Sequence, residues 1–193
     1  KRLSMENALH LALAQEQFVL HYQPQVELAT GRVTGVEALL RWNRPHQGLV
    51  APGDFIPLLE ETGLIVPVGD WVLRAACAQH RAWREAGLPP LRMAVTLSAR
   101  QLRHERFAET VAEALADTGM DPDALELEIT ESAVMQQLEA SLEALRRIRA
   151  LGVHLSMDDF GTGYSSLSHL KLFPIGAVKI DQSFVRDITT DPN

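Results

Sequence analysis

Cysteine is nearly absent from this chain, since Cys77 is the single one among 193 residues. One cysteine cannot form a disulfide within the chain, which favours a reducing compartment, and we predict a cytoplasmic location. Apolar runs of roughly 18 residues or more are also absent, so we predict no membrane insertion of this domain. No secretory signal is recognised, because the basic start at 1–4 leads into a mixed segment at 5–17 and not into an apolar core.

Positive charge is scarce, with 18 lysine and arginine residues against 25 acidic residues and a net charge of −7. A cationic surface drives binding to nucleic-acid backbones, so we predict that neither a DNA nor an RNA duplex is a partner. The seven histidines show no ligand spacing such as His-x-x-x-His, and Cys77 and Ser165-Ser166 lie in no nucleophile motif. These absences argue against a zinc site and against a serine or cysteine hydrolase. A negative chain can still bind a phosphate if metal ions intervene.

Short segments that alternate apolar and polar side chains recur along the chain and predict strands. In 125–130, for example, leucine and isoleucine at odd positions oppose glutamate and threonine at even positions. Segments of helical spacing lie between these strands and end at Gly87, Gly119 and Gly152, where glycine accepts a left-handed conformation. The predicted strands lie at 18–27, 33–40, 92–98, 125–131, 154–159 and 177–181.

Alternating strands and helices predict parallel β-α-β units of the α/β class and a TIM-like (β/α) barrel with its site at the C-terminal face. The three glycines lie 32 and 33 residues apart, a period that also suits an ankyrin or tetratricopeptide array. Such arrays lack carboxylates at the ends of strand-like runs, so the barrel is favoured. Because a complete barrel has eight strands and about 250 residues, we expect an incomplete one. We interpret 1–193 as a single domain that lacks its C-terminal portion and belongs to a longer multidomain protein.

Charged side chains lie near the C-terminal ends of the later predicted strands and of the strand at 33–40. The set is Glu37, Glu128, Asp158, Asp159 and Lys179. Carboxylates that share a barrel interior need a basic partner or a metal ion, and hard oxygen ligands suit Mg²⁺ or Mn²⁺. These residues could also have purely structural roles. Asp158-Asp159 could belong to an ordinary turn before a glycine, and Lys179 could only form an ion pair with a carboxylate. We interpret Glu126 as a structural partner of a base.

Seven motifs in this order are similar to the signature series of the EAL-domain family, and together they extend over nearly the whole chain. They are Tyr22-Gln23-Pro24, Glu37-Ala38-Leu39-Leu40-Arg41-Trp42, Pro52-Gly53-Asp54-Phe55-Ile56-Pro57, Glu61-Thr62-Gly63-Leu64-Ile65, Glu128-Ile129-Thr130-Glu131, the segment from Asp158-Asp159-Phe160-Gly161 to Leu167, and Lys179-Ile180-Asp181. Members of this bacterial family hydrolyse cyclic di-GMP to linear pGpG. The resemblance implies a TIM-like barrel and a phosphodiesterase of bacterial second-messenger signalling.

The resemblance also implies a role for each charged residue. Glu37, Glu128 and Asp158 would be metal ligands, and Asp159 would reach a second metal ion. Lys179 would position the attacking water and the phosphate. The implied cofactor is a pair of Mg²⁺ or Mn²⁺ ions, a type of site that neutralises charge during in-line attack on a phosphodiester.

Further positions carry substrate contacts by resemblance. Gln23, Leu39 and Arg41 would contact cyclic di-GMP, and Glu131 would anchor the loop at 159–167. From the residues alone, Arg41 could instead place a cation over an aromatic ring at the strand end. The resemblance also implies an upstream sensory or diguanylate cyclase domain and a possible homodimer.

One position departs from the family pattern. The third-strand motif of the family reads Val-Asn-Leu-Ser, with the asparagine on a metal, whereas this chain has Val95-Thr96-Leu97-Ser98. A threonine hydroxyl is shorter and a poorer ligand, and the later acidic ligand of the second metal is absent with the last strands. We therefore expect slow or absent turnover by this chain. Two alternatives stay open, namely a non-catalytic cyclic di-GMP sensor and a protein-interaction module.

Overall fold

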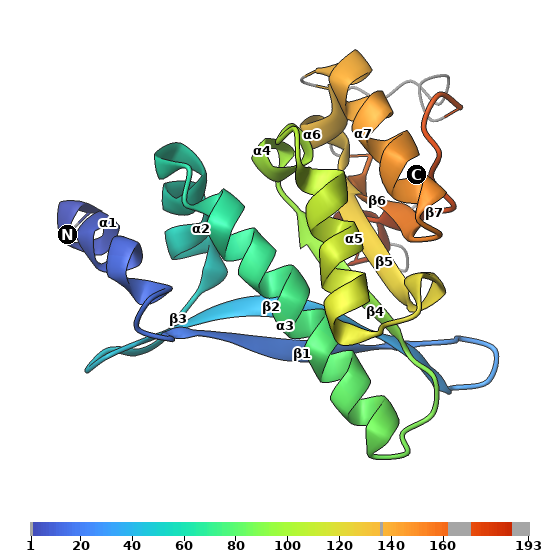
Figure 1. Ribbon diagram of the computed structural model, residues 1–193, viewed down its shortest axis with the longest axis horizontal. Coiled ribbons are helices and arrows are strands. Elements are labelled where there is room, and N and C mark those ends of the chain that lie inside the picture. Colours follow the sequence, from blue (N-terminus) through green and yellow to red (C-terminus); the bar gives the residue numbers. More distant parts are fainter. Residues whose placement is uncertain (1, 136, 162–170, 187–193) are drawn as a thin grey trace.

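The computed structural model describes residues 2–135, 137–161 and 171–186. The first helix is followed by three strands in succession, and groups of helices then separate the next strands (Figure 1). In order they are α1 (Arg2–Ala12), β1 (Phe18–Val26), β2 (Val33–Arg44), β3 (Gly48–Val50), α2 (Pro52–Thr62), α3 (Ile65–Glu85), β4 (Arg92–Leu97), α4 (Ala99–Leu102), α5 (Phe107–Thr118), the 3₁₀ turn η1 (Pro122–Ala124), β5 (Leu125–Thr130), α6 (Glu131–Met135), α7 (Leu138–Ala150), β6 (His154–Phe160), β7 (Ala177–Ile180) and α9 (Gln182–Arg186).

The sheet has seven strands in the order β1-β2-β4-β5-β6-β7, with β3 paired to β2. Strands β2, β4, β5, β6 and β7 run parallel to one another, whereas β1 and β3 pair with β2 in the antiparallel direction. Within the described residues β1 and β7 are the two edges, so the sheet does not close, and the predicted incomplete barrel is confirmed. All six predicted strands are present. The prediction missed β3, because three residues are too few to show a period of two.

The first two strands depart from the predicted parallel β-α-β pattern, since β1 and β2 form an antiparallel hairpin. Their connection is only residues 27–32, in which the Glu27 amide donates to Arg32 O at 2.9 Å and the Gly31 amide to Glu27 O at 2.8 Å. A parallel connection needs a dozen or more residues to return to the starting edge. The short turn therefore fixes the hairpin.

Strand β5 is buried on both faces, as is usual for parallel strands inside an α/β fold. Leu125, Leu127 and Ile129 are all fully buried in the hydrophobic core. Helices α3, α5 and α7 lie on one side of the sheet (Figure 1). The opposite face of β5 carries Glu126 and Glu128, the latter with no exposed surface.

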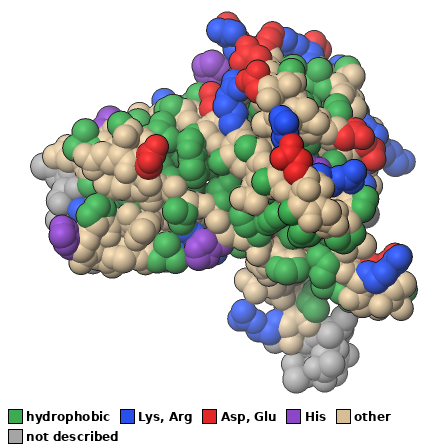
Figure 2. All heavy atoms as spheres, turned by 60° about the horizontal axis from the view of Figure 1, so that its bottom comes forward, with side chains coloured by type: hydrophobic (Ala, Val, Ile, Leu, Met, Phe, Trp, Pro, Cys, Tyr) green, Lys and Arg blue, Asp and Glu red, His purple; other side chains and the backbone are tan. Residues whose placement is uncertain are grey.

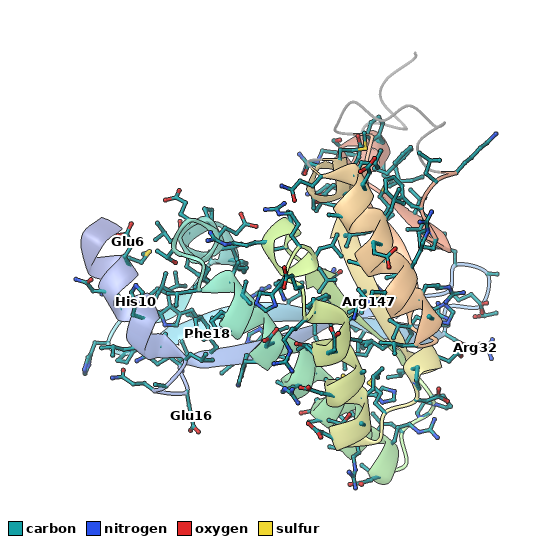
Figure 3. All side chains as sticks on the ribbon, turned by 45° about the horizontal axis from the view of Figure 1, so that its top comes forward. Glu6, His10, Glu16, Phe18, Arg32 and Arg147 are labelled. Atoms are coloured by element: carbon teal, nitrogen blue, oxygen red, sulfur yellow. The ribbon has the colours of Figure 1, made fainter. Side chains whose placement is uncertain are left out.

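A cluster of aromatic rings attaches the hairpin to the first helices. Phe18 begins β1 (Figure 3), and its ring lies 6.1 Å from that of Phe55 in α2 and 6.3 Å from that of Trp71 in α3. Trp42 of β2 has no exposed surface and lies edge-on to Phe55 at 5.8 Å. Its indole N–H donates to Gln17 Oε1 at 3.0 Å, so the buried polar atom of the ring has a partner.

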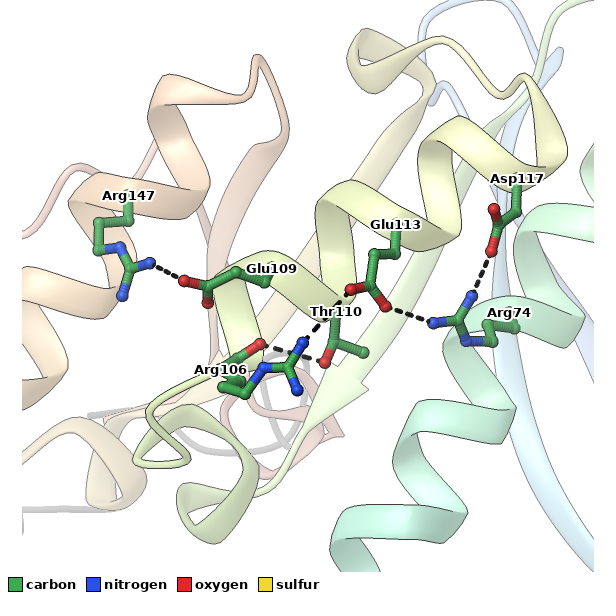
Figure 4. A network of polar contacts seen from close by, with 7 residues as sticks. All are labelled: Arg74, Arg106, Glu109, Thr110, Glu113, Asp117 and Arg147. Atoms are coloured by element: carbon green, nitrogen blue, oxygen red, sulfur yellow. Dashed lines mark hydrogen bonds and ion pairs between the residues drawn. The ribbon is translucent and has the colours of Figure 1, made fainter.

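A network of ion pairs joins the outer helices (Figure 4). Arg74 of α3 contacts Glu113 at 3.0 Å and Asp117 at 2.6 Å, both in α5. Arg147 of α7 pairs with Glu109 of α5. Half-exposed pairs of this kind each contribute about 0–1 kcal/mol, so the network adds little to the stability of the fold. On the face shown in Figure 2, basic side chains likewise lie beside acidic ones.

Candidate active site

Four predicted site residues from four strands meet inside the curved sheet. The Lys179 Nζ atom of β7 lies 3.0 Å from Glu37 Oε2 of β2, 2.6 Å from Glu128 Oε2 of β5 and 3.8 Å from Asp158 Oδ2 of β6. Three strands separate β2 from β7 in the sheet order. In a flat sheet those two strands would be roughly 19 Å apart. The contact at 3.0 Å therefore shows that the sheet is curved like a barrel wall although it is open.

Burial dominates the electrostatics of Glu128. Its side chain has no exposed surface, and Oε1 has no hydrogen-bond partner among the described residues. Burial raises the pKa of Glu128 to about 7, while the hydrogen bond from Lys179 opposes the rise and the nearby Glu37 adds to it. Burial alone would lower the pKa of Lys179, but its contacts with the two glutamates outweigh burial and raise that pKa. The lysine is therefore the positive partner of the cluster.

We expect this buried carboxyl to destabilise the fold as the pH rises. The folded protein holds the Glu128 proton up to about pH 7, whereas the unfolded chain releases it near pH 4.5. Stability gained from the proton is complete below the lower pKa and is lost as the pH rises through the higher one. With a chelator present, the free energy of unfolding should fall by roughly 2 kcal/mol between pH 5 and pH 8 relative to Glu128→Gln. Urea denaturation across this range measures the difference, and parallel profiles would contradict it.

The two aspartates lie at an irregularity of the sheet. The register between β6 and β7 shifts between Met157 and Phe160, and Asp159 has a positive φ of 53°. Such bulges re-aim side chains, and aspartate tolerates this conformation better than most residues. The Asp159 amide donates to Asp158 Oδ1 at 2.9 Å. Burial, with the neighbouring Asp158 and Asp181 charges, raises the pKa of Asp159.

Thr96 lies at the edge of the cluster. It is in register with Glu128 on the adjacent strand, and its hydroxyl donates to Glu37 Oε1 at 3.4 Å. The sequence did not single out Ser156, which is fully buried and lies in register with Glu128 on β6, the other neighbour of β5. The alternation in 154–158 already assigned Ser156 to the interior face, but no motif marked it.

Two of the three substrate-contact candidates line a cavity. Leu39, Arg41 and Thr96 are among the residues that line a cavity of about 420 Å³. The Arg41 guanidinium donates to Leu40 O at 2.9 Å, and the cation over the Trp42 ring is Arg44, at 5.2 Å. The alternative that placed Arg41 over that ring was wrong, because side chains of successive strand residues point to opposite faces.

Gln23 lies in β1, and Glu131 is the first residue of α6, directly after β5. Gln23 is exposed and pairs with Glu37 across the hairpin. Glu131 is 3% exposed, and residues 162–167 of the loop it was predicted to anchor lie outside the described residues. At the opposite end of the strands, Glu126 lies 3.4 Å from Arg92 beside a cavity of about 840 Å³. The interpretation of Glu126 as a structural partner of a base is confirmed, and that base is Arg92.

The donor set fits a hard cation by its chemistry. Glu37, Glu128 and Asp158 supply carboxylate oxygens, and the buried Glu128 Oε1 has no hydrogen-bond donor in the described part of the chain. In that same part, no three acidic, histidine or cysteine side chains converge closely enough to hold a metal ion. The Lys179 ammonium lies among the carboxylates instead.

The curved α/β sheet encloses carboxylates and a lysine, so the chain is an α/β-barrel type of protein with an acidic interior site. Comparison identifies the family, because the family model described as "EAL domain" matches residues 6–193. The chain belongs to the EAL domain family.

Several relatives of this chain are named as cyclic di-GMP phosphodiesterases. The chain is 47% identical over 191 residues to the bifunctional diguanylate cyclase/cyclic di-GMP phosphodiesterase MucR of Pseudomonas aeruginosa, covering 99% of this chain and 28% of MucR. It is 43% identical over 190 residues to the cyclic di-GMP phosphodiesterase PdeR of Escherichia coli, covering 98% and 28%. The chain thus spans little more than a quarter of the length of these curated relatives.

Solved structures agree with this assignment. The MucR phosphodiesterase in complex with c-di-GMP superposes with a TM-score of 0.92 at 47% identity, over 97% of this chain and 76% of that chain. The FimX EAL domain of Xanthomonas citri in complex with c-diGMP superposes with a TM-score of 0.87 at 26% identity, over 98% of this chain and 74% of that chain.

In the described residues, no helix is both long enough and apolar enough to cross a membrane.

Proposed function

We propose that this chain hydrolyses cyclic di-GMP to linear pGpG with the help of Mg²⁺ or Mn²⁺, at a slow rate because Thr96 replaces the asparagine of the family pattern. The observation that carries the proposal is that Glu37, Glu128 and Asp158 each have a carboxylate oxygen within 3.8 Å of the Lys179 ammonium inside the curved sheet. Membership of the EAL family and the cyclic di-GMP phosphodiesterase relatives support it. The c-di-GMP complex of MucR supports the same ligand for this chain.

The residues divide the work by their chemistry. Glu37, Glu128 and Asp158, with Asp159 for a second ion, would hold the cations. When bound, such ions supply an activated water and neutralise charge on the phosphodiester. Lys179 would orient water and phosphate by its ammonium donors.

The cavity beside the cluster would hold a nucleotide. Arg41 and Leu39 line it, and the guanidinium suits a phosphate. We place Gln23 along the same groove and assign the loop-anchoring role to Glu131. In the cell we propose a cytoplasmic domain of a longer signalling protein, with an upstream sensory or diguanylate cyclase domain and a homodimeric assembly.

The direct test is to incubate the chain with cyclic di-GMP and Mn²⁺ or Mg²⁺ and to separate the products by chromatography. Appearance of pGpG, abolished by a chelator, is the expected result. Titration calorimetry with Ca²⁺ measures binding on the same sample. Absence of both product and binding would refute the proposal.

A second candidate is a sensor that binds cyclic di-GMP without cleaving it, and the observation that favours it is Thr96. The hydroxyl of Thr96 is turned to Glu37 Oε1 at 3.4 Å, and a neutral hydroxyl is a weaker cation ligand than an amide carbonyl. Binding in the calorimeter without pGpG would select this function.

Thr96→Asn provides the corresponding gain-of-function prediction. An amide oxygen at this position should strengthen Mn²⁺ binding and raise kcat/KM, each by roughly tenfold. Calorimetry with Mn²⁺ and product chromatography measure the two quantities. Thr96→Val is the matched control, since it removes the hydroxyl at nearly constant volume and should give no gain. Unchanged Kd and rate in Thr96→Asn would show that this position does not limit the site.

A further inference from the structure

The Lys179 ammonium contacts the same carboxylate oxygens that a cation in this site would use. It lies 3.0 Å from Glu37 Oε2 and 2.6 Å from Glu128 Oε2, with Asp158 Oδ2 at 3.8 Å. Ammonium contacts of 2.6 and 3.0 Å are charge-assisted hydrogen bonds of full strength. These are therefore contacts that must be broken before either oxygen can ligate an ion.

We propose that Lys179 competes with the divalent cation for the Glu37, Glu128 and Asp158 cluster, so that cation binding drives its Nζ atom out of the cluster. The inference rests on the metal site of the proposed function and adds a regulatory role for the lysine. Lys179 is thus an internal counter-ion that holds the cluster together and sets how much free cation the protein needs.

The charge of the cluster and the exposure and flexibility of the Lys179 side chain support this exchange. With all three carboxyl groups ionised, the cluster including the ammonium has a formal charge of −2, which attracts a divalent ion. The Lys179 side chain is 31% exposed while Glu128 is not exposed at all, so the lysine has a route to solvent and Glu128 does not. Lysine carries a point charge on a flexible four-carbon stem, which suits it to move without a change of the backbone.

The first test measures where the lysine is. The sequence contains only Lys1, Lys171 and Lys179, so peptide mass spectrometry can follow each one during low-conversion acylation by an amine-reactive ester. Adding Mn²⁺ to chelator-treated protein should raise the acylation rate of Lys179 several-fold and leave the exposed Lys171 unchanged. An unchanged or lower rate at Lys179 would overturn the proposal.

The second test measures the competition itself, by calorimetry with Mn²⁺ and without cyclic di-GMP. Lys179→Met should tighten the Mn²⁺ Kd by about tenfold, because a positive charge leaves the site. Lys179→Arg, which keeps the charge, should not tighten the Kd, and Lys171→Met at an exposed lysine is the matched control. If Lys179→Met does not fold, Lys179→Gln replaces it with the same expectation. Equal or weaker binding in the neutral variants would refute competition.

These outcomes separate the inference from the proposed function. Lysine release and tighter binding without any pGpG would uphold the inference and refute hydrolysis by this chain. Production of pGpG with no lysine release would do the reverse. If Mn²⁺ binds neither the wild-type chain nor the neutral variants, both the competition and the metal site are refuted.

Discussion

Glu128→Gln should reduce kcat/KM for cyclic di-GMP hydrolysis by about 10³-fold, equivalent to about 4 kcal/mol of transition-state stabilisation. The substitution keeps the size of a side chain that has no exposed surface, so packing is preserved. It removes the charge that Lys179 contacts at 2.6 Å and that we assign to cation binding. Chromatographic product assays with saturating Mn²⁺ measure the rate.

Glu126→Gln is the matched control for this experiment. Glu126 lies two residues earlier on the same strand and face, but its partner is Arg92, and both residues line the cavity of about 840 Å³. Hydrolysis by Glu126→Gln should therefore stay within about twofold of the wild-type rate, a limit that corresponds to less than 0.5 kcal/mol. Equal losses in the two variants would mean that the strand, and not the site carboxylate, determines activity.

Trp42→Ala should lower the free energy of unfolding by about 3–5 kcal/mol, the largest stability effect we expect from a single substitution in the hairpin. Trp42 is fully buried and contacts the rings of Phe18 and Phe55. Its removal leaves a cavity between β2 and α2 and leaves Gln17 without its indole donor. Urea denaturation followed by circular dichroism measures the change.

Trp83→Ala is the comparison that tests the role of burial. Trp83 is only half-buried and packs edge-on against Tyr22 at 4.7 Å. Because fewer contacts are lost, the cost should be about 1–2 kcal/mol. Similar costs for the two tryptophans would show that the aromatic cluster at the base of the hairpin is not what holds β1 and β2 to the helices.

Local patterns were sufficient to predict most elements of this fold. The alternation in 125–130 and the helical spacing before Gly119 each depend on residues only a few positions apart, and both elements are present. The antiparallel direction of β1 and β2 follows from the length of the loop between them and not from the periodicity of either strand. Strand β3 was too short to be recognised. The bulge at Asp158-Asp159 carries no periodic signal, so the sequence could not reveal how Asp159 is aimed.

The sequence by itself determined most of the elements, the family and the acidic residues, because periodicity and motifs depend on neighbouring positions. Only the tertiary structure decided which charges meet. Glu37 and Lys179 are 142 positions apart, and the curvature of the sheet brings them to 3.0 Å. The structure also decided which acids pair elsewhere, since Glu126 and Glu128 share one strand face yet reach Arg92 and Lys179. Contact across a curved sheet depends on strand order and twist, which no local pattern contains.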